Sequence, residues 1–128
     1  MKQFDILALG NLCGELLAWV DRFPGTGDGI HAQRTLWTGG GMAGNLAHAA
    51  ARLGARVALV STIGDDFIGD RIVTQLREAG VNTDYVLRRT GMSSPLTIIM
   101  VDPERGRAGL VTHTETYVTL QSDEIPDA

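Results

Sequence analysis

The sequence has little of three things: it contains one cysteine, one lysine and no long apolar run in 128 residues. The single cysteine, Cys13, excludes an internal disulfide and fits a protein of the reducing cytoplasm. Lys2 is the only lysine and the formal net charge is −4, which argues against nucleic acid as a partner because nucleic-acid-binding domains carry basic patches. No apolar run approaches the ~20 residues of a membrane-spanning helix, so no membrane partner is expected.

Residues that bind metals are also sparse and scattered. His31, His48 and His113 are far apart in the sequence and have no ligand spacing with Cys13, so no metal site is expected. The composition is 44% hydrophobic and 20% charged, which predicts a globular chain with room for one domain and its core. The first residues, MKQFDILALGNL, lack a small-residue cleavage site after a basic region, and we interpret them as a first strand.

Hydrophobic patterning predicts strands that alternate with helices. One helix is expected over Met42–Leu53 with Gly54 as its C-terminal cap, and another over residues 65–80, with acidic residues at its start and Gly80 as its cap. Ser122 is expected to be the N-cap of a further helix. Strands are expected over residues 4–10, 30–37, 56–64, 83–89, 96–101 and 108–114, the last two as a hairpin joined by DPERGR.

The order of these elements favours an α/β fold in which the strands linked by helices pair in parallel. Such a sheet is ordinarily covered by helices on both faces, and this sequence supplies only two good helices. We therefore expect residues 1–128 to be the front part of a larger α/β domain.

A literal G-x-G-x-x-G occurs at Gly39, Gly41 and Gly44, and it raises the hypothesis of a dinucleotide-binding, NAD-linked enzyme. That fingerprint needs a buried strand before its first glycine and an acidic residue that closes the next strand. The preceding residues, AQRTLWT, are too polar, and the strand at 57–60 ends in Ser61 and Thr62. The NAD-linked enzyme is therefore the weakest of the hypotheses.

The glycines have a second interpretation. Glycines 39–41 let the backbone approach a ligand closely where a helix begins, and Asn45 in the first turn offers both a donor and an acceptor. This chemistry suits the hydroxyl groups of a sugar. The alternative is a glycine-rich turn in which Asn45 is a simple helix cap.

The stretch GGMAGNLAHAAARLGARVALVSTIGDDFIGDRIVTQLREAGV, residues 40–81, resembles the N-terminal signature of the PfkB (ribokinase-like) family of carbohydrate and nucleoside kinases. The resemblance implies a three-layer α/β/α fold with a small β-lid, of which residues 1–128 would form the N-terminal part. The lid segments would be about 16–37 and 96–114. In many members the lid pairs with a second subunit, which implies a homodimer.

The resemblance also implies site residues. Glu15, Gly40, Gly41 and Asn45 match substrate-contacting positions, so a sugar or nucleoside is the implied substrate, with ATP and magnesium as the implied cofactors. The family has Asp more often than Glu at position 15, and a β-branched residue more often than Gly14. These departures leave the identity of the substrate open, and a solvated loop carboxylate remains the alternative for Glu15.

The family's second signature, a Gly-Ala-Gly-Asp-like stretch with the catalytic aspartate and the anion hole, has no match in residues 1–128. No catalytic residue is therefore assigned, and Asp65 and Asp66 are interpreted as helix-start residues favoured by the dipole. The leading hypothesis is an ATP-dependent kinase whose N-terminal part, taken alone, is inactive. The alternative is a non-catalytic module that binds sugar or dimerises.

Overall fold

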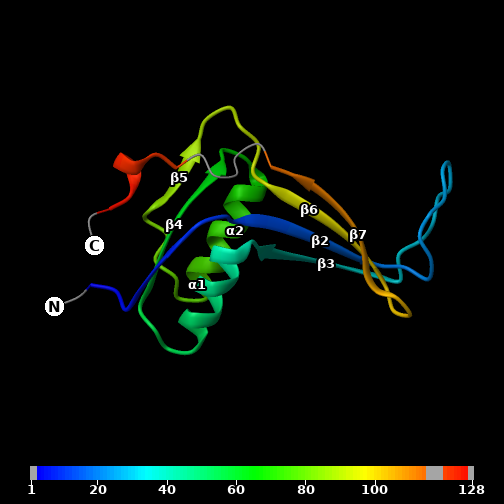
Figure 1. The fold of residues 1–128 in the computed structure, drawn as a ribbon, viewed down its shortest axis with the longest axis horizontal. Helices are drawn as coiled ribbons and strands as arrows, with labels where there is room; N and C mark the ends of the chain where they lie inside the picture. The colour runs from blue at the N-terminus through cyan, green and yellow to red at the C-terminus, as the bar shows by residue number, and fades with distance from the viewer. Residues whose placement is uncertain (1–2, 115–119, 127–128) are drawn as a thin grey trace.

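The computed structural model describes residues 3–114 and 120–126, and its strands form two separate sheets (Figure 1). The three-stranded sheet is parallel, in the order β1 (Ile6–Leu9), β4 (Val57–Gly64), β5 (Val86–Arg89). The four-stranded sheet has the order β3 (Arg34–Gly40), β2 (Cys13–Trp19), β6 (Leu96–Asp102), β7 (Gly106–His113). The helices are α1 (Met42–Arg52), α2 (Phe67–Glu78) and a 3₁₀ turn, η1 (Ser122–Glu124).

The hydrophobic core lies between the three-stranded sheet and the two α-helices, which together we call the α/β layer. All positions of β4 are buried, and Val57, Leu59 and Ile63 share one cluster with residues of both helices. Helix α1 contributes only small side chains, Ala43, Ala47 and Ala50, so its backbone lies close to the sheet. Within the described residues, neither helix is both long and apolar enough to cross a bilayer.

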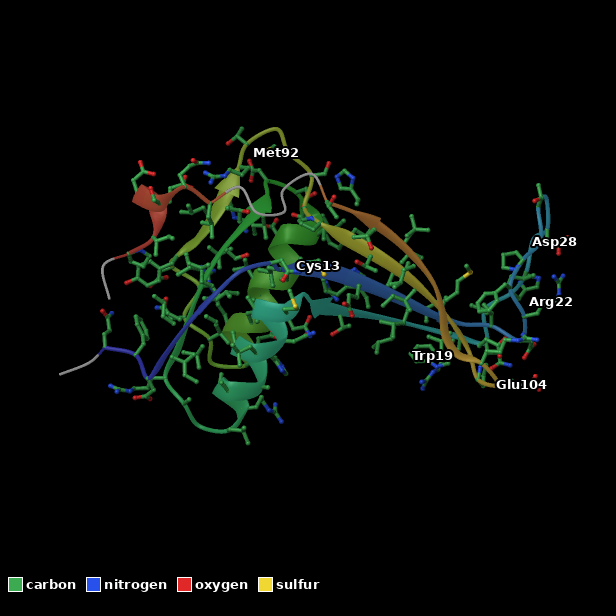
Figure 2. The ribbon with its side chains drawn as sticks, viewed as in Figure 1. Cys13, Trp19, Arg22, Asp28, Met92 and Glu104 are labelled. Carbon is green, nitrogen blue, oxygen red and sulfur yellow. The ribbon has the colours of Figure 1, made fainter. Side chains whose placement is uncertain are left out.

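The four-stranded sheet extends away from the α/β layer as a separate arm (Figure 1). Strands β2 and β3 are antiparallel, as are β6 and β7, and the hairpin expected around residues 102–107 is confirmed. The two hairpins are joined by parallel pairing of β2 with β6. Figure 2 shows Cys13 where the arm leaves the α/β layer, and Trp19 and Glu104 at its far end.

A hydrogen-bonded junction fixes the start of β6 on the α/β layer. Both carboxylate oxygens of Asp66, the N-cap of α2, accept hydrogen bonds from Ser94, at 2.8 Å from its amide and 2.6 Å from its hydroxyl. The Ser94 hydroxyl also accepts from the Gly64 amide at 3.1 Å. A Cβ on Gly64 would lie 2.2 Å from the Met92 carbonyl oxygen, and one on Gly69 would lie 2.8 Å from the Ser94 hydroxyl. The glycines therefore make room for the loop that Asp66 holds.

The electrostatics of Asp66 agree with this structural role. Burial by itself raises the pKa of the Asp66 carboxyl, but hydrogen bonds from the Ser94 hydroxyl and from backbone amides outweigh it, so its pKa lies below the ordinary value. The interpretation of Asp66 as a helix-start residue is confirmed. Its neighbour Asp65 is exposed and lies 3.9 Å from Arg88.

Three expected elements differ from the structure. The strand expected over 30–37 is β3, Arg34–Gly40, so Gly39 and Gly40 belong to a strand and only Gly41 remains between strand and helix. The backbone of Gly40 pairs with Cys13, and this pairing needs no side chain. The expectation that Ser122 is the N-cap of a further helix was wrong: Gln121 is the N-cap, and only three residues follow in a 3₁₀ turn. The strand expected over 83–89 is limited to β5.

Candidate functional site

A shallow depression of about 330 Å³ lies where the arm meets the N-terminal end of α1. Side chains from one face of the four-stranded sheet form its floor, and residues at the start of α1 form its wall. It therefore combines groups from both parts of the molecule. Its lining residues are Asn11, Cys13, Glu15, Gly41, Met42, Asn45, Thr97, Leu110 and Thr112.

Glu15 is a half-buried strand residue of β2, opposite Thr38 of β3. Its side chain bends across the β2–β3 pair, because a Cβ built on Gly40 would be only 2.3 Å from the Glu15 Cδ and Oε1 atoms. Gly40 itself is buried beneath the carboxylate and does not line the depression. Gly40 thus leaves space for the Glu15 side chain.

Gly41 begins α1 with a positive φ of 88°, a conformation that glycine adopts without strain. A Cβ at this position would also lie 2.6 Å from the Asn11 carbonyl oxygen. Asn11 in turn satisfies the helix start, since its Oδ1 accepts from the Met42 amide at 3.0 Å and its carbonyl accepts from the Gly44 amide at 3.4 Å. The free amides of the first turn are therefore capped from a different segment of the chain.

Asn45 does not cap the helix. The N-cap residue is Gly41, without a side-chain cap, and the Asn45 backbone amide donates to the Gly41 carbonyl at 2.8 Å. The interpretation of Asn45 as a simple cap was therefore wrong. Within residues 3–114 and 120–126, neither the Asn45 amide group nor the Glu15 carboxylate has a hydrogen-bond or ion-pair partner.

Of the four residues predicted for substrate binding, three line the depression, Glu15, Gly41 and Asn45, while Gly40 supports the first of them. Sequence reasoning missed Asn11, whose signal was its position directly after the first buried strand. It also missed Cys13, Thr97 and Thr112, which lie on sheet strands with no motif to mark them.

The context of the three glycines differs from that of a dinucleotide fingerprint. The strand that contains the first glycine and precedes the other two, β3, is antiparallel to β2 and lies in the arm, whereas the fingerprint requires a strand of the parallel sheet. Among the described residues, the α1 start is occupied by Asn11 and the α2 start by the Asp66 carboxylate. Neither helix start is thus arranged to receive the phosphates of a nucleotide.

The described residues also hold no group of three or more His, Cys, Asp or Glu side chains that could bind a metal ion. The residues of this depression offer instead a carboxylate, two carboxamides and two hydroxyls. A carboxylate accepts hydrogen bonds, a carboxamide both donates and accepts, and each matches a hydroxyl of a ligand. The geometry fits a small polyhydroxylated molecule.

Comparison with known proteins identifies relatives of the whole chain. A family model described as "pfkB family carbohydrate kinase" matches residues 3–125. The nucleoside kinase of Methanothermobacter thermautotrophicus is 31% identical over 105 residues, which make up 80% of this chain and 33% of that protein. The chain spans about a third of the length of the curated relatives it matches.

Solved structures support the same fold. The fructokinase of Xylella fastidiosa with bound ATP has a TM-score of 0.75 and 26% identity, and the match covers 94% of this chain and 37% of that one. The ribokinase of Giardia lamblia has a TM-score of 0.82 at 23% identity, over 92% of this chain and 38% of that one, and shows the likeness of fold alone. The ribokinase-like α/β fold expected from the sequence is confirmed.

Proposed function

Since the chain belongs to the pfkB family of carbohydrate kinases, we propose that the protein transfers the γ-phosphoryl group of ATP to a hydroxyl of a sugar or nucleoside. The observation that carries the proposal is that the Glu15 carboxylate and the Asn45 amide line one depression and have no hydrogen-bond or ion-pair partner in the part of the chain that the structure describes. Both relatives and fold point to small hydroxylated substrates: one relative is named a nucleoside kinase and one structural neighbour a fructokinase.

In this proposal the Glu15 carboxylate accepts hydrogen bonds from substrate hydroxyls, and the Asn45 amide orients the ring against it. Gly41 lets the backbone at the start of α1 approach the substrate, and Gly40 gives Glu15 its space. The arm formed by β2, β3, β6 and β7 serves as the lid over the substrate, and residues 1–128 form the N-terminal part of the kinase domain.

In this proposal, the binding sites for ATP and Mg²⁺ are formed by residues other than those that the structure describes. ATP, when bound, supplies the phosphoryl group; the described helix starts do not fit its phosphates, and no acidic cluster here fits the metal. What these residues contribute is substrate binding and orientation, on which phosphoryl transfer largely depends.

The proposal is tested by ADP release from the complete protein with D-ribose, D-fructose and adenosine as acceptors. Glu15→Gln keeps the shape of the side chain and removes its charge, so KM should rise about 10- to 100-fold, as for a lost charged hydrogen bond. Asn45→Ala should raise KM about tenfold. Glu104→Gln, at the far end of the arm, is the matched control and should leave KM unchanged.

Unchanged kinetics of Glu15→Gln and Asn45→Ala would contradict the assigned roles, and the absence of ADP release with every acceptor would contradict the kinase itself. Sugar binding without ADP release by the complete protein would favour the non-catalytic binding module. Gly41→Ala is a poor test, because its positive φ and its contact with Asn11 predict a loss of folding as well.

We also propose that the protein is a homodimer through the arm. Large apolar side chains are exposed on both of its faces: Leu36 and Leu110 on one, Ile98 and Val111 on the other. A second subunit would bury such surface. The 128-residue chain alone is expected to release no ADP and to self-associate in sedimentation experiments; a monomer, or measurable phosphorylation by this chain, would contradict the expectation.

A further inference from the structure

Two threonine hydroxyls form a pair in the floor of the depression. Thr97 of β6 and Thr112 of β7 are directly opposite in register, and their Oγ1 atoms are 3.3 Å apart. Thr97 is buried, with 6% of its surface exposed, whereas Thr112 is exposed. The pair therefore presents its outer hydroxyl, that of Thr112, to whatever fills the depression.

The pair continues a polar row that crosses all four strands of the arm. Thr97 is opposite Glu15 of β2, and Glu15 is opposite Thr38 of β3. The next row on the same face is apolar and contains Leu36, Leu17, Ile99 and Leu110. The polar row is the one adjacent to the start of α1, where Asn45 lines the same depression.

The hydrogen-bonding capacity of this pair is not used up within the described residues. One hydroxyl donates to the other, so the accepting hydroxyl keeps its own proton and both oxygens keep a lone pair. No other hydrogen bond to either hydroxyl is formed within residues 3–114 and 120–126. When Thr97 donates to Thr112, a ligand hydroxyl that reaches Thr112 finds both a donor and an acceptor; in the reverse direction Thr112 offers it an acceptor.

From this placement we infer that Thr97 and Thr112 are specificity-determining residues: Thr112 hydrogen-bonds an oxygen of the substrate on the side away from Asn45, and Thr97 orients the Thr112 hydroxyl. The inference rests on the proposed function and deepens it. The substrate would then be hydrogen-bonded on one side by Asn45 and on the other by Thr112. The site would therefore bind a ring with hydroxyls on both sides more tightly than a deoxy analogue.

The experiment measures binding by calorimetry without ATP, using D-ribose, 2-deoxy-D-ribose, D-fructose and adenosine as probes of the complete protein. Thr112→Val should raise the Kd of the tightest-binding probe about tenfold, as for one lost hydrogen bond. The ratio of the Kd values of the weaker probes to that of the tightest probe should fall. Thr97→Val/Thr112→Val removes the pair without leaving an unpaired buried hydroxyl, and should weaken the Kd by a similar factor.

Thr35→Val is the matched control, since Thr35 is exposed on the opposite face of the same sheet, opposite Ala18. It should leave every Kd unchanged. If the variants at 97 and 112 shift only the melting temperature and leave the Kd values and their ratios unchanged, the pair merely stabilises the sheet and the inference is overturned.

The same samples separate this inference from the proposed function. Wild-type protein that binds a probe, loses affinity in Thr112→Val and releases no ADP with ATP would support the threonine subsite and contradict the kinase. Wild-type protein that releases ADP while Thr112→Val keeps its affinity would support the kinase and overturn the subsite. Failure of the wild-type protein to bind any of the four probes would contradict both.

Discussion

The α/β layer buries its apolar side chains, whereas the arm leaves several of them exposed to solvent. Every residue of β4 is buried, and Leu59 has no exposed surface. In the arm, Leu36 is 50% exposed and Val111 is 66% exposed, although both lie in regular strands. The layer thus buries its apolar side chains in a closed core, whereas the arm leaves large apolar side chains exposed on regular strands.

The sharpest test of this comparison removes the same side chain in both regions. Leu59→Ala should lower the free energy of unfolding by about 2–5 kcal/mol, because it opens a cavity in a closed core. Leu36→Ala should lower it by less than about 1 kcal/mol, since half of the side chain is already in water. Urea denaturation of both variants measures the difference, and equal losses would show that the arm is as tightly packed as the layer.

The junction between the two regions is tested by adding one methyl group. Gly64→Ala would place a Cβ 2.2 Å from the Met92 carbonyl oxygen and 2.4 Å from the Ser94 amide. Because backbone atoms cannot move aside cheaply, we expect a loss of about 3 kcal/mol. Gly29→Ala is the matched control, because no described atom lies within 4 Å of the added methyl group. A Gly64 variant as stable as the Gly29 variant would show that the loop at 92–94 yields easily.

A smaller effect is expected when the junction loses only its hydrogen bonds. Ser94→Ala leaves the Gly64 amide without its acceptor and removes one of the donors to Asp66. The cost of an unpaired buried group predicts a loss of about 2 kcal/mol. Thermal denaturation should show this loss, with Ser122→Ala on the exposed 3₁₀ turn as the control. If the arm is positioned by this junction, KM for the best acceptor should also rise while kcat changes little.

The smallest expected change in stability comes from an ion pair at the end of β5. Arg89 forms a bidentate pair with Glu124 of η1, at 2.7 and 2.6 Å, and these hydrogen bonds lower the pKa of Glu124 to about 2 from its ordinary value of 4.5. A carboxyl whose pKa is lowered by folding stabilises the protein above its unfolded pKa and loses this contribution as the pH falls toward its folded pKa.

The melting temperature of wild type should therefore exceed that of Glu124→Gln at pH 6, and the difference should shrink between pH 4.5 and pH 2. Glu78→Gln, on the exposed side of α2, is the control. A difference that stayed constant over this range would show that the pair does not titrate with folding.

Much of the α/β layer could be predicted because its signals are local. The alanines of α1 and the apolar residues of α2 recur at helical spacing, and both helices are followed by the predicted glycines, Gly54 at φ 93° and Gly80 at φ 89°. The β3 strand was less predictable, since Gly39 and Gly40 are paired by their backbones with β2 and carry no strand propensity of their own.

The candidate site was predictable only where a motif marked it. Gly41 and Asn45 belong to one short stretch, and Glu15 was found through the resemblance to a family. The Thr97–Thr112 pair and the capping by Asn11 depend on contacts between segments distant in the sequence. Periodicity gives the face on which a strand residue lies, but it does not give the neighbouring strand.

The sequence by itself determined the two helices, the buried strand β4 between them and the family to which the chain belongs, because periodicity, caps and motif spacing are properties of consecutive residues. Only the tertiary structure decided that β2 pairs in parallel with β6, that Glu15 bends over Gly40, and that Asp66 holds the loop before β6. These features depend on which segments pack together. Burial of the whole core and hydrogen bonds between distant parts of the chain determine that packing.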